Sequence, residues 1–535
     1  MLRGSRPKSL APWYQRVPPV QALAVLVSLL MTVVAVAQDP MLNSDGVLYL
    51  LAAESFAAGD LNLTLSLHKL PLYPVLIASM QSLTGAQFET SAYLVNGLLQ
   101  ALLVFAFIGA VAEVEGTQRN AWLAAVVILS FTGFNDYRSE IIRGFGYWAL
   151  AMPGFWLFVR YMRTGRVGVL AGALLLFAVT PLFRAEGLVL VLLMPFAILL
   201  RPDCPLAIRV RHLITVGAIY LVLLGLLVAA MLVAGNTPPA TMLDFPLAHV
   251  SNVVSALTEH MQAREAAVAQ HLLGRFSYEY AGAVVWATIL IILAGELLSS
   301  LGWVHGLAVF LALRAGMSQL TSYGRPALLA MMLINLLLLG AFVIASGFLT
   351  GRYTLAFALF ALLLAPTGVR VAYRAAKTRY PAGRQVPVLV SVLGLAAFYM
   401  LVDGVVSLSP GKVHAQSAAV WLRDNTDASA SVLSFDPTIS YRAGRLTAAA
   451  YAERLKRPRK VTQAGQTTMK SWQLALEENR WQRHDYVVAS IGRKRLHEQA
   501  EIERVIGRPP LKVFENSRKD RVVVFDVRAL PVAVD

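Results

Sequence analysis

Long apolar runs alternate along the chain with short polar stretches, and this alternation is the dominant pattern in the sequence. An apolar run of roughly 20 residues is long enough to cross a bilayer as a helix. Such runs occur at 19–37, 93–112, 120–134, 147–160, on both sides of PLFRAEG, and at 213–234, 281–313, 326–347, 352–369 and 386–407. They predict an all-α polytopic membrane protein with about eleven transmembrane helices.

Two of the loops between these runs are long. The first, 38–92, contains apolar patterns at 46–58 and 72–84, which predict amphipathic helices that lie in the membrane interface. The second covers 236–280. We expect both loops on the outer side of the membrane.

The pattern changes after Leu408, where the sequence becomes charged and mixed. The segment VWLRDNTD indicates the end of a helix, and ASVLSFD, HDYVVASI and DRVVVFDV indicate strands bounded by polar residues. The sequence therefore predicts a transmembrane domain over 1–410, followed by a small α/β soluble domain over 411–535.

Composition supports a membrane protein, since 57% of the 535 residues are hydrophobic and only 15% are charged. The net charge of +16 would favour nucleic acid as a partner of a soluble domain. Here many of the basic residues lie in short loops between apolar runs, which is typical of the cytoplasmic side. We therefore predict no nucleic-acid partner and expect contact with anionic membrane lipids. The single Cys204 excludes an intramolecular disulfide.

The same charges predict the orientation of the chain. Residues 1–18 contain Arg3, Arg6, Lys8 and Arg16 but no acid, so we expect a cytoplasmic N-terminus. The loop 370–384 has five basic residues and no acid, and it should also lie inside. This requires 281–313 to cross once, as a broken helix, although it is long enough for two crossings. The C-terminal domain then lies outside.

This orientation gathers ionisable residues on the outer face. They are Asp45, His68, Lys69, Asp136, Arg138, Glu140, Arg143, Arg184, Glu186 and Arg352. Charged residues at the ends of membrane helices are costly, and they are functional candidates for that reason. Several acids and bases that converge from separate segments predict a site on this face.

The segments that carry these residues resemble the GT-C glycosyltransferases, polytopic enzymes that use a polyprenyl-phosphate sugar. The resemblance is to the branch that contains the protein O-mannosyltransferases and the lipid A aminoarabinose transferase. It rests on SDGVLYLLAAESFAAGD with HKLPLYPVLIA, on NDYRSEIIRGFGYWALAMPGFWLFVRYMR, on SGFLTGRYTLAFALFALLLAP, and on AAVWLRDNTDASASVLSFDPTISYRAGR. The likeness covers most of the chain as a pattern of loops and spans.

The chain departs from this branch in its acids. Many relatives have an Asp-Glu pair in the first loop, where this chain has Asp45 followed by Gly46. The second acid could be Asp136 or Glu140, and Gly144 stands where an acid follows Arg in some relatives. A divalent metal is possible as a cofactor, with Asp45 and Asp136 as its ligands if one binds.

Sugar transfer from a polyprenyl phosphate needs a base for the acceptor hydroxyl and cations for the departing phosphate. Asp45 is our candidate for the catalytic base, with N-capping of the helix at 46–58 by Ser44 or Asp45 as the alternative. Arg352, together with Tyr353 in the late Arg-Tyr helix, is the candidate phosphate ligand. Its alternative is an interfacial arginine that reaches toward water.

The remaining candidates are pairs of neighbouring residues. His68 and Lys69 could bind the phosphate or the acceptor, or form a solvated loop pair. Glu140 and Arg143 are three residues apart, so on a helix they would share a face and could bind substrate or form a salt bridge. The third pair, Arg184 and Glu186, flanks the junction of two spans and could bind substrate or pair with neighbouring residues.

These observations predict an integral membrane glycosyltransferase that moves one sugar from a polyprenyl-phosphate carrier to an extracytoplasmic lipid, glycan or protein hydroxyl. The resemblance implies inversion at the anomeric carbon, a bacterial inner membrane and undecaprenyl phosphate. Three alternatives stay open. They are a polymerase or ligase of lipid-linked glycans with a diphosphate donor, a membrane transporter or flippase, and a non-catalytic scaffold.

Overall fold

The computed structural model describes residues 17–39, 41–233, 256–274, 276–380, 385–406, 412–456 and 480–528. The basic N-terminal residues 1–16 and part of the second long loop, 236–255, lie outside these ranges. The chain forms two compact units. The helical unit comprises Met1–Thr32, Asn96–Arg138 and Arg143–Val405, and the sheet unit comprises Val33–Val95, Ser139–Ile142 and Val406–Asp535.

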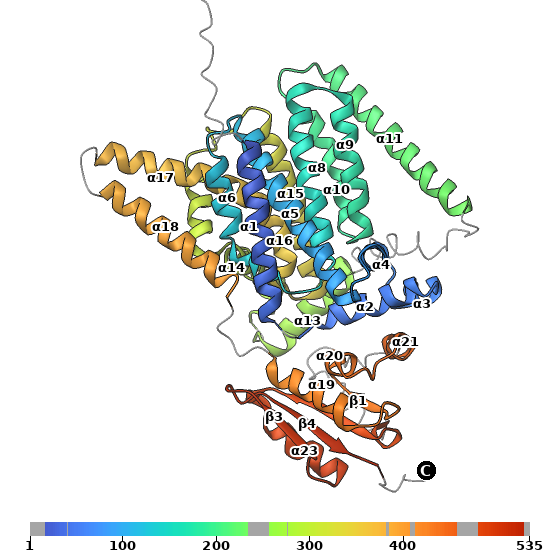
Figure 1. The fold of residues 1–535 in the computed structure, drawn as a ribbon. Coiled ribbons are helices and arrows are strands. Elements are labelled where there is room, and N and C mark those ends of the chain that lie inside the picture. The colour runs from blue at the N-terminus through green and yellow to red at the C-terminus, as the bar shows by residue number, and fades with distance from the viewer. Residues whose placement is uncertain are drawn as a thin grey trace, which may run out of the picture. The chain divides into compact units, whose positions relative to one another are not determined.

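Within the described ranges, seven stretches of helix are long and apolar enough to cross a membrane. They belong to α1 (Val17–Gln38), α5 (Phe88–Glu115), α11 (Leu206–Val233), α14 (Ala281–Arg314), α15 (Gly324–Ser346), α16 with α17 (Gly351–Ala361 and Ala365–Arg379) and α18 (Gln385–Asp403) (Figure 1). The predicted multi-pass membrane protein is therefore confirmed, whereas the predicted number of about eleven crossings is not.

The other predicted crossings form shorter or more polar helices. They are α6 (Ala121–Leu129) with α7 (Thr132–Asn135), α8 (Gly144–Thr164), α9 (Val167–Val179) and α10 (Gly187–Leu193). Helix α9 gives way to a 3-10 segment at Pro181, and α10 does so at Pro195, because proline cannot donate the backbone hydrogen bond that an α-helix requires. Helix α8 has 21 residues but contains Pro153 and ends with Arg160 and Arg163 among its last residues.

The run predicted as one broken crossing is the long helix α14. It is interrupted at Gly302, where φ is 66° and ψ is 168°. Glycine adopts a positive φ without the steric penalty that other residues meet, so the break falls at the residue that tolerates it.

The sheet unit contains a four-stranded mixed sheet in the order β1-β2-β4-β3. Its strands are β1 (Val432–Ser434), β2 (Tyr486–Ile491), β3 (Lys512–Glu515) and β4 (Arg521–Asp526). Strand β1 pairs with β2 in parallel, and the other two pairs are antiparallel. The strands predicted in 411–535 are all present, and β3 was not predicted.

Helices cover both faces of this sheet, as Figure 1 shows for α19 (Val413–Asn425) and α23 (His497–Ile506). Successive residues of a strand point to opposite faces. Val524 of β4 therefore shares a buried cluster with Leu422 of α19, and its neighbour Phe525 shares another with Ile502 of α23. Burial on both faces explains the continuous apolar runs of β2 and β4.

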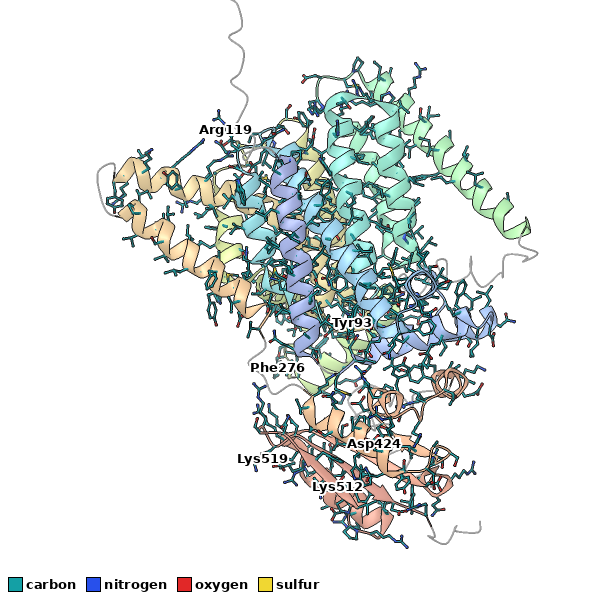
Figure 2. All side chains as sticks on the ribbon, viewed as in Figure 1. Tyr93, Arg119, Phe276, Asp424, Lys512 and Lys519 are labelled. Atoms are coloured by element: carbon teal, nitrogen blue, oxygen red, sulfur yellow. The ribbon has the colours of Figure 1, made fainter. Side chains whose placement is uncertain are left out.

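The exposed edge of the sheet is β3. Lys512 begins this strand, and Lys519 lies in the turn that joins it to β4 (Figure 2). Lysines at such an edge oppose pairing with a strand of another molecule.

The first long loop folds within the sheet unit as α2 (Ser44–Ala57), α3 (Leu61–Leu67) and α4 (Leu72–Thr84). The helices predicted at 46–58 and 72–84 are thus confirmed. Two side-chain contacts join the loop and the start of α5 to α20 (Pro437–Arg442). Tyr441 donates a hydrogen bond to Glu54 at 2.6 Å, and Arg442 forms an ion pair with Glu89 at 2.6 Å.

Candidate functional site

The predicted site residues fall in both units. Asp45, His68, Lys69 and Glu140 belong to the sheet unit. Asp136, Arg143, Arg184, Glu186, Arg352 and Tyr353 belong to the helical unit. Each group is described by itself.

Asp45 lies in the first turn of α2 and is half-buried. A carboxylate there is favoured by the partial positive charge of the helix N-terminus. The N-cap position is held by Asn43, with φ −80° and ψ 155°, and the Asn43 side chain makes no capping hydrogen bond. The N-cap residue is therefore neither Ser44 nor Asp45.

The side chain of Asn43 instead holds a distant segment. Its Nδ2 donates to the backbone O of Ile141 at 3.2 Å, and its Oδ1 accepts from the backbone N–H of Ile141 at 2.9 Å. Nearby, Ser139 donates a hydrogen bond to Asp39 at 3.3 Å. These bonds fix the segment Ser139–Ile142, which includes Glu140, beside the start of α2. Sequence reasoning missed Asn43, although its place directly before a helix was a signal for a structural role.

Gly46 makes this approach possible. A Cβ added at Gly46 would lie 2.7 Å from Oδ1 of Asn43 and 3.1 Å from Cβ of Ile141. Both atoms belong to the Asn43–Ile141 pair, so a larger residue would have to displace it. The position that carries the second acid of the Asp-Glu pair has no room for one in this chain.

Stacking on an aromatic ring of α2 places His68 beside that helix. Tyr49 follows Asp45 by four residues, so the two share a helix face. The ring of Tyr49 stacks on His68, with centroids 5.3 Å apart, and meets Tyr73 edge-on at 5.1 Å. The Nδ1 of His68 accepts the backbone N–H of Leu70 at 3.3 Å, which leaves Nε2 as the protonated nitrogen of the neutral ring.

Lys69 follows His68 and is exposed. The acid at the start of α2 and these two nitrogen-bearing side chains therefore belong to one region of the sheet unit.

In the helical unit, the nearly buried Arg184 forms an ion pair with the half-buried Glu186. Arg184 Nη2 lies 2.6 Å from Glu186 Oε1, and Nε lies 3.3 Å from Oε2. Burial raises the pKa of Glu186, but the Arg184 charge and its hydrogen bonds, with a further contribution from Arg143, outweigh burial and lower the pKa to about 2. Of the two roles predicted for this pair, the structure shows pairing.

Tyr353 completes this group. Its ring lies 5.1 Å from the guanidinium carbon of Arg184 and stacks on Phe342 at 4.2 Å. These residues line a cavity of about 40 Å³ together with Tyr147, Trp148, Asn335, Leu338, Leu339 and Ala356. A water molecule needs roughly 10–15 Å³ by this measure, so the cavity holds small molecules of that size and not a sugar phosphate.

The described part of the second long loop packs beside this cavity. Met261 of α13 (Met261–His271) belongs to the buried cluster against which Phe342 and Tyr353 pack. Arg264 of the same helix donates to the backbone O of Ile344 at 2.8 Å, near the end of α15. A cation at a helix C-terminus can donate hydrogen bonds to the last carbonyl groups, and it interacts favourably with the negative end of the helix dipole.

The other predicted residues are placed as follows. Arg352 is the second residue of α16, and Asp136 is the C-cap residue of α7. Arg143 is the N-cap residue of α8, whereas Glu140 lies in the non-helical segment before it. Glu140 and Arg143 therefore do not share a helix face, because the chain from 140 to 142 is not helical and Ile141 is bonded to Asn43.

The two carboxylates named as ligands if a divalent metal binds are Asp45 and Asp136. These residues belong to different units. Across the described ranges, no group of three or more His, Cys, Asp or Glu side chains is placed to hold a metal ion.

Arg138, one of the ionisable residues predicted on the outer face but given no role of its own, is a buried cation. Its side chain is fully buried, and Nη1 donates to O and Oγ of Ser28, to Thr32 and to Gln100. Its Nε donates to Asn135 at 2.8 Å. These bonds tie α1 and α5 to the turn after α7, so Arg138 positions the chain directly before the segment that carries Glu140.

No protein-family model matches this sequence. A search of curated proteins gave no match. Among solved structures, the archaeal oligosaccharyltransferase AglB from Archaeoglobus fulgidus, in complex with an inhibitory peptide and a dolichol-phosphate, matches with a TM-score of 0.53 at 12% identity. The match covers 98% of this chain and 76% of that chain.

The Archaeoglobus fulgidus oligosaccharyltransferase in complex with Zn and sulfate also matches, with a TM-score of 0.53 at 13% identity over 96% of this chain and 74% of that chain. ArnT from Cupriavidus metallidurans in the apo state matches with a TM-score of 0.49 at 13% identity, over 95% of this chain and 97% of that chain. The similarity to AglB shows that the chain has the GT-C fold, as the sequence predicted.

Proposed function

We propose that this chain is an integral membrane glycosyltransferase that moves one sugar from a polyprenyl-phosphate carrier to a hydroxyl group of an extracytoplasmic acceptor. The observation that carries the proposal is the arrangement on α2, where Asp45 and Tyr49 share a face and Tyr49 holds His68 by stacking. This arrangement supports the proposal because it holds a carboxylate and an imidazole, the proposed phosphate ligand, in one region of the sheet unit. The GT-C fold supports this reading, and the AglB neighbour was solved with a dolichol-phosphate.

The proposed reaction is a single displacement. The acceptor oxygen attacks the anomeric carbon as Asp45 removes its proton, and the bond from that carbon to the phosphate oxygen breaks. The polyprenyl phosphate leaves, and attack from the opposite face inverts the anomeric carbon. His68 Nε2–H and the Lys69 ammonium stabilise the negative charge that grows on the phosphate.

The remaining predicted residues keep proposed roles in substrate binding. Arg352 is proposed to bind phosphate, since a guanidinium matches phosphate oxygens in a bidentate manner. Glu140 and Arg143 are proposed to contact the substrate. The charge of Arg184 is already compensated by Glu186, so this pair and Tyr353 are proposed to shape the binding region without neutralising the donor.

We further propose that the sheet unit faces the extracytoplasmic side of a bacterial inner membrane, and that membrane lipids and the lipid-linked donor are the partners. The donor would then approach Asp45 from the membrane, and the acceptor from the aqueous side. No proposed step uses a metal ion.

The test is single-sugar transfer by the purified protein from a panel of radiolabelled polyprenyl-phosphate sugars to a membrane lipid extract. We expect transfer from one donor, and its loss in Asp45→Asn. Asp60→Asn is the matched control, because Asp60 lies in the same loop and serves as the cap of α3 through a bond to Leu63 N at 2.8 Å, which Asn also makes.

Equal transfer by Asp45→Asn and the wild type would contradict the role of Asp45 as base. Transfer from diphosphate-linked donors alone would replace the proposed donor class with the ligase alternative. A folded protein that transfers from neither class would contradict the proposed activity.

A further inference from the structure

A second cavity, of about 250 Å³, lies wholly within the sheet unit. It is lined by Ser44, Phe435, Asp436, Pro437, Ala489, Ser490, Ile491, Glu498 and Ile502. Phe435 and Asp436 directly follow β1, and Ser490 and Ile491 end β2. These strands are parallel, so the cavity lies at their carboxyl ends, where open α/β sheets bind ligands.

The polar lining of this cavity selects its ligand. Its ionisable groups are the carboxyls of Asp436 and Glu498, joined by the hydroxyls of Ser44 and Ser490, and none of the described lining residues is basic. Ionised carboxylates only accept hydrogen bonds, so they match ligands rich in O–H or N–H donors and repel phosphates. The cavity therefore does not suit the phosphate of the donor.

Hydrogen bonds fix the carboxylate of Asp436 and the backbone of the loop that forms this wall of the cavity. Asp436 Oδ1 accepts from the backbone N and Oγ1 of Thr438 at 2.9 and 2.6 Å. Arg454 donates to the backbone oxygens of Ser434 and Phe435 at 3.0 and 3.1 Å, which fixes the loop after β1.

On the other wall, Glu498 is 2% exposed and lies 3.7 Å from Arg495. A wall whose side chains are already fixed loses little conformational entropy when a ligand binds.

Size and shape narrow the ligand further. Pockets for drug-sized ligands begin at about 300 Å³, so a cavity of about 250 Å³ accepts a single ring and not an extended chain. Phe435, Ile491 and Ile502 give it an apolar wall against which the C–H face of a sugar ring can pack. An apolar wall with a few fixed acceptors is the usual composition of a small-molecule site.

We infer that this cavity binds one neutral, hydroxyl-rich sugar ring of the acceptor. The inference rests on the proposed function, and it narrows the acceptor to a glycan or glycolipid. Ser44 lines the cavity and is the residue before Asp45, so a ring bound here lies at the end of α2 that carries the proposed base.

Saturation-transfer NMR on the detergent-solubilised full chain tests the inference without requiring transfer. The probes are methyl glycosides of glucose, mannose and galactose, with glucose 6-phosphate as the anionic counterpart. We expect at least one neutral glycoside to bind and the phosphate to bind at least about tenfold more weakly, because of the two carboxylates.

Two variants locate the binding. Ser490→Trp fills the cavity mouth and should abolish binding, whereas Ser417→Trp, at an exposed serine of α19 away from the cavity, should not. Asp436→Asn keeps the cap on α20, because Asn is as good an N-cap as Asp, and should weaken binding by roughly tenfold. Circular dichroism and thermal unfolding confirm that each variant is folded.

The inference is overturned if no neutral glycoside binds, if the phosphate binds as well, or if both cavity variants bind like the wild type. Its failure is separable from that of the proposed function. Sugar transfer without glycoside binding would contradict the proposed sugar site but not the proposed enzymatic activity. Glycoside binding without transfer from any donor would contradict the enzymatic activity but not the sugar site.

Discussion

The side-chain amide of Asn43 is hydrogen-bonded to both backbone groups of Ile141, at 3.2 and 2.9 Å. Asn43 precedes Asp45 by two residues, and Ile141 follows Glu140. One amide therefore joins the two segments that carry the candidate acids Asp45 and Glu140. The Asn43 amide bonds Ile141 in the way that a backbone peptide group of a neighbouring strand would. The alignment of the two segments therefore depends on this residue.

Asn43→Ala should loosen this junction. It leaves both backbone groups of Ile141 without their partner, which costs about 1–3 kcal/mol for buried polar groups. We expect a lower thermal midpoint and a transfer rate reduced by at least about tenfold, since misplacing catalytic groups by about 1 Å has effects of that order. Thermal unfolding and donor turnover measure the two effects.

Asn425→Ala is the control for this variant. Asn425 is exposed and donates to the backbone O of Trp421 near the end of α19, so its loss should change neither quantity appreciably. A wild-type rate in Asn43→Ala would show that the junction does not position the acids.

Gly46→Glu restores the Asp-Glu pair of the resembled branch, and we expect it to harm this protein. The added side chain meets Asn43 and Ile141, and overpacking of this kind costs about 1–3 kcal/mol. Gly168→Ala, at a helical position with nothing within 4 Å of the added Cβ, should be tolerated. Higher transfer in Gly46→Glu, with unchanged stability, would mean that the missing acid and not the close approach governs this position.

The Arg184–Glu186 pair predicts a pH-dependent stability. Because the pKa of Glu186 is lowered from 4.5 to about 2 on folding, its stabilising contribution is fully present above pH 4.5 and is lost as pH falls toward 2. Glu186→Gln should destabilise the protein at pH 7 by about 1–3 kcal/mol, since Arg184 stays buried and loses its anion while Glu186 is partly solvated. The difference in thermal midpoint from wild type should shrink as pH approaches 2.

Replacing both partners tests whether the Arg184–Glu186 pair only stabilises the fold or also contacts the substrate. Arg184→Met with Glu186→Met removes both charges, and replacement of a buried pair by apolar groups is often neutral or stabilising. We expect stability near the wild type. A double variant that folds but transfers no sugar would show that the pair contacts the substrate, contrary to the shaping role proposed above.

Replacing His68 or Lys69 should show whether each residue acts in the transition state or in substrate binding. His68→Phe keeps the stacking on Tyr49 but removes Nε2–H, and Lys69→Met removes an exposed cation. If both stabilise the leaving phosphate, each lowers kcat by at least about tenfold, because loss of a transition-state hydrogen-bond donor costs about 2.7–4 kcal/mol in known sites. A change in KM alone would assign them to ground-state binding.

The orientation can be measured with the natural cysteine. Cys204 is the single cysteine of the chain and lies in a loop predicted to be cytoplasmic. A membrane-impermeant maleimide added to intact spheroplasts should leave Cys204 unlabelled and should label Asp424→Cys introduced into a Cys204→Ser background, since Asp424 is exposed at the end of α19. The reverse labelling pattern would invert the proposed topology.

The sequence by itself determined the class of fold. Apolar runs long enough to span a bilayer predict membrane helices wherever they occur, because unpaired backbone groups cannot remain in lipid. The strands YVVASI and RVVVFD were predictable for a related reason, since a strand buried on both faces is apolar at every position. Seven helices of the described ranges are long and apolar enough to cross a membrane, and prolines at 181 and 195 interrupt two further apolar runs that were predicted as crossings.

Only the tertiary structure decided which polar residues meet. Glu140 and Arg143 have the spacing of a helical pair, yet the chain between them is not helical and its Ile141 is bonded to Asn43. Arg184 and Glu186 were candidates for binding or pairing, and their bidentate contact follows from the turn between α9 and α10.

Contacts between segments about 100 residues apart depend on how the helices pack, which periodicity does not encode. The acidic cavity of the sheet unit shows the same limit. Ser44, Asp436 and Glu498 come from three separate helices or loops, and no local pattern joins them. Residue type and spacing thus predicted the elements and the candidate chemistry, and long-range packing decided their partners.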